Sequence, residues 1–244
     1  MRRFWPLLIL ILLVPALLVA AQEQLQDRLF LGLAYYFQGI ERDNLGMRNL
    51  GIAELKKLTE SNPQATEPRL TLAVALHSLG YYEEAGDHYR RLTEQTDWPE
   101  IRVLWGDALR AQGKFMEAYS QYTQALDGDP DLVTAHYGLG VVLEGWGRLD
   151  RAEEHYQRVY EQAPHLHKNS LRLASLFQED GRLEEAIEVL LTARSYGEKA
   201  EIAYQLGRAY YQLGDYQQAK DHLQRALQLD PEHGAARSLL STIP

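Results

Sequence analysis

Apolar residues recur at spacings of three and four along most of residues 66–232. This period fits one face of an α-helix, whereas a half-buried strand would alternate apolar and polar residues. The apolar stretches come in pairs, and a glycine stands between the two members of each pair. The pattern therefore predicts amphipathic helices that are joined two by two through tight turns.

These helix pairs repeat every 33 or 34 residues. The same phase of each period carries a small residue, at Ala85, Ala118, Ala152, Ala186 and Ala219. Five residues earlier stands the glycine that permits the turn, at Gly80, Gly113, Gly147, Gly181 and Gly214. Four residues later comes a large apolar side chain, at Tyr89, Tyr122, Tyr156, Leu190 and Leu223. A single hairpin cannot bury its apolar faces, but stacked hairpins can.

The pattern resembles the tetratricopeptide repeat, in which Leu206-Gly207 would open a unit and Pro231 would close it. The resemblance implies an all-α fold, a right-handed solenoid of stacked helical hairpins. It places five repeats at 66–98, 99–132, 133–166, 167–199 and 200–232.

The segments that flank the five repeats are less regular. Residues 22–65 are expected to form an atypical first repeat, with an insertion at 40–46 that fits either extra helical turns or a longer loop. Residues 233–244 are expected to form a capping helix that covers the last repeat with Ala235, Leu239 and Leu240.

Residues 1–21 have the pattern of a signal peptide or of a single transmembrane anchor, which would be an N-terminal hydrophobic helix. Arg2 and Arg3 precede 18 uncharged residues, 4–21. This length exceeds a usual signal core of about 7–15 residues and reaches the short end of the roughly 17–25 that span a bilayer. Small residues before Gln22 would allow cleavage there. Both interpretations leave the N-terminus inside, whereas a buried helix of a cytosolic protein is the third alternative.

We therefore expect a repeat domain on the extracytoplasmic, periplasmic side of the cell membrane, either anchored through residues 4–21 or released to the periplasm by cleavage before Gln22. The formal net charge is −9, and no basic run exists beyond Arg2-Arg3. Binding to nucleic acid, which needs clustered Lys and Arg, is accordingly not expected.

The chain shows no motif for catalysis, for a cofactor or for a metal. It has no cysteine, and its one close histidine pair, His165 and His167, has no third ligand nearby. We expect no enzyme activity, no cofactor and no metal site. Three pairs of acids are expected to start second helices, where anions favour the helix dipole: Glu83-Glu84, Glu153-Glu154 and Glu184-Glu185.

The resemblance also implies a concave groove lined by the first helix of each repeat. The positions that would face this groove are Asp107, Arg110, Tyr137, Val141, Glu144, Lys168, Arg172, Ser175, Gln178, Tyr204, Arg208 and Tyr211. Tyr and Arg are the residue types enriched at binding hot spots. A full clamp for a peptide carboxylate is not expected, because the earlier clamp positions hold Val103, Asp107 and Gly138.

A looser site for an acidic peptide remains as a hypothesis, formed by Lys168, Arg172 and Arg208. The expected function is therefore a non-enzymatic scaffold or adaptor that binds partner proteins or peptides of a membrane or envelope complex. The alternative is a fixed structural subunit of one membrane protein complex, with Trp146 and the 40–46 insertion as contact points. An enzyme is the least favoured alternative.

Overall fold

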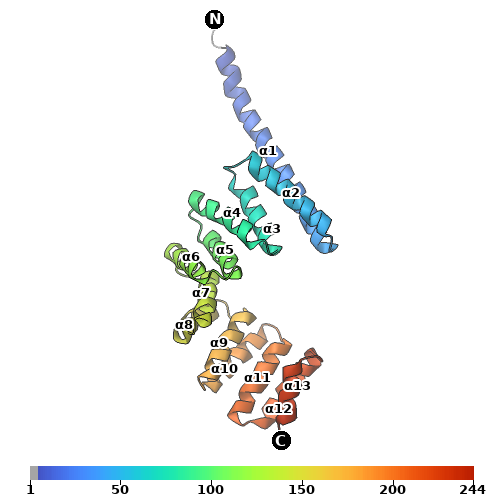
Figure 1. Ribbon diagram of the computed structural model, residues 1–244, viewed down its shortest axis with the longest axis vertical. Coiled ribbons are helices and arrows are strands. Elements are labelled where there is room, and N and C mark those ends of the chain that lie inside the picture. Colours follow the sequence, from blue (N-terminus) through green and yellow to red (C-terminus); the bar gives the residue numbers. More distant parts are fainter. Residues whose placement is uncertain (1–4) are drawn as a thin grey trace. The chain divides into compact units, whose positions relative to one another are not determined.

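The computed structural model describes the backbone of residues 5–244 and the side chains of residues 22–244 (Figure 1). Within these residues the chain is entirely helical, without strands. The helices of the described part are α1 (Trp5–Glu41), α2 (Leu45–Ser61), α3 (Thr66–Ser78), α4 (Tyr82–Gln95), α5 (Pro99–Ala111), α6 (Phe115–Gly128), α7 (Val133–Gly145), α8 (Leu149–Gln162), α9 (His167–Glu179), α10 (Leu183–Ser195), α11 (Ala200–Leu213), α12 (Tyr216–Leu229) and α13 (Gly234–Thr242).

The helices group into two compact units, which divide between Lys114 and Phe115. The first unit contains α1 to α5 and the second contains α6 to α13. The signal or anchor segment expected at residues 1–21 lies outside the residues whose side chains are described. In the described part of the chain, no helix combines the length and the apolar character needed to cross a membrane.

The turns between paired helices confirm the assignment of the five repeat glycines. Each has a positive φ, between 70° and 84°, which only glycine adopts without strain. The five repeat alanines are fully buried, as are the five large apolar residues four positions later. Within each unit, the periodic positions therefore form the packed interior of the hairpins.

The hairpin of α1 and α2 shows how the 40–46 insertion is accommodated. Both helices are extended, and only Arg42 to Asn44 separate them. The Asn44 side chain caps α2 by accepting a hydrogen bond from the Met47 N–H at 3.1 Å. The insertion is thus extra helical turns, and the longer loop is not formed.

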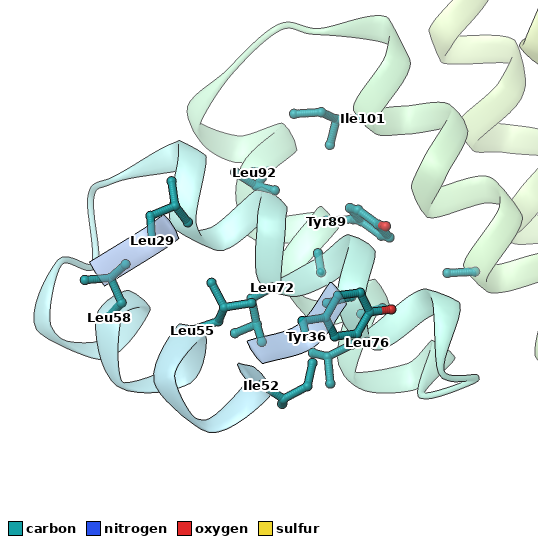
Figure 2. Packing of buried hydrophobic residues seen from close by; sticks show 14 residues of the cluster. Leu29, Tyr36, Ile52, Leu55, Leu58, Leu72, Leu76, Tyr89, Leu92 and Ile101 are labelled. Carbon is teal, nitrogen blue, oxygen red and sulfur yellow. The ribbon is translucent and has the colours of Figure 1, made fainter. Parts of the chain in front are cut away.

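Close approach of α1 and α2 depends on Gly51. A Cβ atom at this position would lie 2.7 Å from the Gly32 carbonyl oxygen and from the Tyr36 nitrogen. The side chains of Tyr36, Leu55 and Leu72 then meet in the core of the first unit (Figure 2).

The second unit ends as a capped stack. Helix α13 packs on α12 and α11, and Leu239 and Leu240 contact the last apolar cluster as expected. The buried alanine of α13 is Ala236, whereas Ala235 is exposed. The expectation for Ala235 was wrong because Ala236, three and four residues before Leu239 and Leu240, lies at the centre of the face that these leucines share.

The acid pairs also need one correction. Glu83-Glu84 and Glu184-Glu185 lie in the first turns of α4 and α10. Glu153-Glu154 lie in the second turn of α8, because that helix already begins at Leu149. Glu153 instead accepts a hydrogen bond from Arg182 at 2.7 Å, an ion pair between neighbouring hairpins.

Candidate functional site

Ten of the twelve predicted groove residues lie on three first helices of the second unit, α7, α9 and α11, and we call this set the first-helix face. The other two, Asp107 and Arg110, lie on α5 in the first unit and contact each other at 3.3 Å. Within the face, Lys168 is exposed, Gln178 is 4% exposed, and the remaining eight side chains are half-buried. Direct packing joins α9 to α11.

The centre of the first-helix face is a network around Glu144. Its carboxylate accepts hydrogen bonds from Arg172 of α9 at 2.7 Å and from the Tyr156 hydroxyl of α8 at 2.6 Å. The Tyr137 ring lies beside this network, with its centroid 6.1 Å from that of the Tyr156 ring. The charge of Arg172 is therefore compensated within the fold.

Burial and the contacts within this network shift the pKa values of Tyr156 and Arg172. Burial raises the pKa of the Tyr156 hydroxyl, and the bond to Glu144 raises it further. Burial alone would lower the pKa of Arg172, but the hydrogen bond with Tyr137 and the charge of Glu144 outweigh it and raise that pKa overall. Arg172 thus stays charged, and Tyr156 stays protonated, at any physiological pH.

Gln178 joins α9 to α11. Its amide nitrogen donates to the Gln205 carbonyl oxygen at 3.2 Å, and its amide oxygen accepts a short hydrogen bond from Arg208. A neutral amide orients Arg208 but does not cancel its charge. Arg172 and Arg208 are therefore both positioned by the preceding repeat, but with different electrostatic results.

The two tyrosines of α11 that were predicted to face the groove, Tyr204 and Tyr211, differ in their contacts within the fold. The Tyr204 ring packs on His233 with ring centroids 4.9 Å apart, and it belongs to the cluster under α13. The Tyr211 ring lies 5.7 Å from that of Tyr216 and is half-buried. Tyr211 and Arg208 stand three residues apart, on one face of α11.

Three predicted groove residues, Lys168, Val141 and Ser175, take no part in the hydrogen-bond networks described above. Lys168 is exposed at the start of α9, and Val141 is half-buried on α7. The Ser175 hydroxyl lies 3.5 Å from the Glu179 carboxylate. The structure therefore gathers Tyr137, Glu144 and Arg172 into one network and Gln178 and Arg208 into another.

Two residues that position the helices of the first-helix face, Asn169 and His233, were not identified from the sequence. Asn169 is 1% exposed and donates from its amide to the Tyr156 carbonyl oxygen at 2.9 Å, which fixes α9 on α8. His233 bonds Glu201 at 3.2 Å while it packs on Tyr204. Asn169 stands between the polar residues Lys168 and Ser170, so its burial has no signal in the local sequence. Nothing in the repeat period indicates the role of His233 either.

Comparison with protein families identifies the repeats. Four family models, each described as a tetratricopeptide repeat, match residues 66–91, 103–167, 145–209 and 200–233. Among curated proteins, Tetratricopeptide repeat protein 14 of Mus musculus is 29% identical over 170 residues, which are 67% of this chain and 21% of that protein. This chain thus spans about a fifth of that relative's length.

Solved structures give the same fold. The protein described under "Functional Characterization of Pseudomonas Aeruginosa pilF" superposes with a TM-score of 0.72 at 17% identity, over 90% of this chain and 98% of that one. PilW, described as a widely conserved type IV pilus biogenesis factor, gives a TM-score of 0.70 at 17% identity, over 87% of this chain and 98% of that one. At this level of identity the likeness establishes the fold alone.

Proposed function

Because this chain is a tetratricopeptide repeat protein, we propose that it is a non-enzymatic scaffold that holds an acidic segment of a partner protein on its first-helix face. Stacked repeats present side chains of successive first helices on one extended surface. Binding there needs no cofactor, and the half-buried Arg and Tyr side chains are of the types that carry interface energy.

One observation carries the proposal, which is the difference between Arg172 and Arg208. Glu144 neutralises Arg172, whereas Arg208 is held by the neutral amide of Gln178. Arg208 therefore keeps a positive charge available on a pre-oriented side chain, next to the Tyr211 ring. We place the acidic contact at Arg208, with Lys168 as an outer cation.

The test removes or adds one available charge. In Arg208→Gln, capture of the partner from cell extract should weaken about tenfold, the effect of about 1.4 kcal/mol. In Glu144→Gln, which uncovers Arg172, capture should strengthen, and both effects should shrink in high salt.

The control for this test is Lys220→Gln, which removes one charge from the exposed surface of α12. It should leave capture unchanged, and circular dichroism should show all three variants folded. If Arg208→Gln and Lys220→Gln weaken capture of the partner equally, the effect comes from the net charge of the chain, and the proposed site is refuted.

We further propose that the repeat domain lies outside the cytoplasmic membrane. The support is the sequence of residues 1–21, with Arg2 and Arg3 ahead of an uncharged stretch and no positive charge directly after it. A reporter fused after Pro244 should be active only outside the cytoplasm, and activity only inside would refute the proposal. Intact mass then separates cleavage before Gln22 from a retained anchor.

A fixed subunit of a membrane complex is the second candidate function. It is favoured by apolar side chains that α1 and α2 leave exposed, among them Phe30 at 67% and Phe37 at 56%. Such a patch fits a permanent partner better than an exchanging one. A type IV pilus assembly is one complex to test, because PilW is described as a biogenesis factor for it. Stoichiometric co-purification in mild detergent, lost in Phe30→Ser with Phe37→Ser, would favour this function over an exchanging scaffold.

A further inference from the structure

The first unit contains a cavity that the repeat pattern does not require. Its volume is about 230 Å³, and side chains of α2, α3 and α4 line it. Leu72, a member of the core cluster shown in Figure 2, lines it on the apolar side. The other walls carry three cationic side chains, Lys56, Arg69 and Arg91, in a chain of net charge −9. His88 also lines the cavity, and burial lowers the pKa of its ring.

Arg69 is the central residue of this cavity. Its side chain is buried, with 4% of the residue exposed, and one terminal nitrogen donates to the Pro63 carbonyl oxygen. Its Nε–H has no partner among the described residues, and neither has the buried Nδ1 of His88. Buried polar groups in folded proteins are almost always paired. An unpaired Arg69 donor and an unpaired His88 ring nitrogen, both on residues that line this cavity, therefore favour a ligand that forms hydrogen bonds.

The charges around the cavity indicate the sign of that ligand. Arg91 and Arg69 repel each other, since burial and then the charge of Arg91 lower the pKa of Arg69. Of the two carboxylates that line the cavity, Glu84 is already bonded to Lys56 at 2.6 Å, and Glu60 is exposed. Among the described residues, no ion pair joins Arg69 or Arg91 to a carboxylate, although Glu60 lines the same cavity.

We propose that this cavity binds a phosphate group. Arg69 Nε–H, the His88 ring in the tautomer with its proton on Nδ1, and the Arg91 guanidinium approach from α3 and α4 as separate donors. A tetrahedral oxyanion presents oxygens in several directions and suits such a set better than a planar carboxylate does. Arg side chains are also the preferred partners of phosphate.

The test is a calorimetric titration of the full chain with inorganic phosphate, at ionic strength held constant with chloride. Arg91→Gln should weaken phosphate binding about tenfold, and Arg69→Gln should abolish it. Glu84→Gln should strengthen binding several-fold, because it frees Lys56 and removes a negative charge. Arg90→Gln is the control: Arg90 is exposed on α4 like Arg91, but it does not line the cavity and pairs with Glu94 at 3.0 Å. Its removal should change the affinity less than about twofold.

A second titration distinguishes the source of the phosphate group. Glycerol 3-phosphate that binds as well as inorganic phosphate supports an esterified phosphate, as in a lipid headgroup, whereas exclusion of the ester supports the free ion. Absence of phosphate binding to the folded parent chain would overturn the proposal, and so would equal weakening in Arg90→Gln and Arg91→Gln. If Arg69→Gln fails to fold, the proposal is still tested by Glu84→Gln, which should bind phosphate more strongly than the parent chain.

Discussion

Replacing Gly140 with alanine tests whether the hairpin of α7 and α8 is packed as tightly as the structure shows. A Cβ atom at Gly140 would lie 2.4 Å from Cε1 and 2.7 Å from Cδ1 of the Tyr156 ring. Tyr156 is fully buried and its hydroxyl is held by Glu144 at 2.6 Å, so the ring cannot turn aside freely. Overpacking of this kind costs about 1–3 kcal/mol, whereas alanine gains about 1 kcal/mol in helix propensity. We expect a net destabilisation of up to about 2 kcal/mol.

Gly145→Ala provides the matched control on the same helix. No atom lies within 4 Å of a Cβ placed there, so only the propensity gain of about 0.5–1 kcal/mol applies. Thermal unfolding followed by circular dichroism should therefore move in opposite directions, by a few degrees each, since about 1 kcal/mol shifts Tm by roughly 2–4 °C at this size. A higher Tm for both variants would refute the close contact between Gly140 and Tyr156.

Two further predictions concern the second unit. Leu206 is fully buried, so Leu206→Ala should lower the free energy of unfolding in urea by about 2–5 kcal/mol, and a loss below about 1 kcal/mol would contradict its place in the core. Burial, followed by repulsion from His136, Arg151 and Arg158, lowers the pKa of His155 from 6.5 to about 4. The unfolded chain therefore takes up this proton first, and stability should fall as pH drops from about 6.5 towards 4, by about 1–2 kcal/mol after allowance for partial exposure. The urea midpoint of His155→Asn should depend less on pH over this range than that of the parent chain.

The hairpins could be predicted because the same sequence pattern occurs five times in the chain. A single Gly-to-Ala spacing of five residues is weak evidence, but five copies at a period of 33 or 34 residues leave few other folds. The turn glycines and the buried alanines were accordingly identified from the sequence and confirmed. A position that carries the same kind of residue in all five copies is stronger evidence than any single residue, and the positions shared in this way are those of the core.

The first hairpin was less predictable because its glycines have another role. Gly39 and Gly51 stand twelve residues apart, where the turn glycine and the repeat alanine of the other units stand five apart. This spacing predicts the insertion at 40–46 but leaves its structure open. Both glycines lie inside helices, where the neighbouring helix leaves no space for a Cβ atom. Whether a glycine permits a turn or a close approach depends on the opposing surface, and that surface belongs to a different part of the chain.

The first-helix face was predictable in position but not in charge. Glu144 and Gln178 occupy the twelfth position of their predicted repeats, 133–166 and 167–199, and each bonds to an arginine on the next first helix, about 30 residues later. The repeat period locates all four side chains, but it does not reveal that they meet in these pairs. One change between carboxylate and amide at the twelfth position decides whether the following arginine is neutralised or left available. If the proposed binding of acidic segments is correct, selectivity for them can vary from repeat to repeat without any change in the packing, because the hydrogen bond that orients the arginine is kept in both cases.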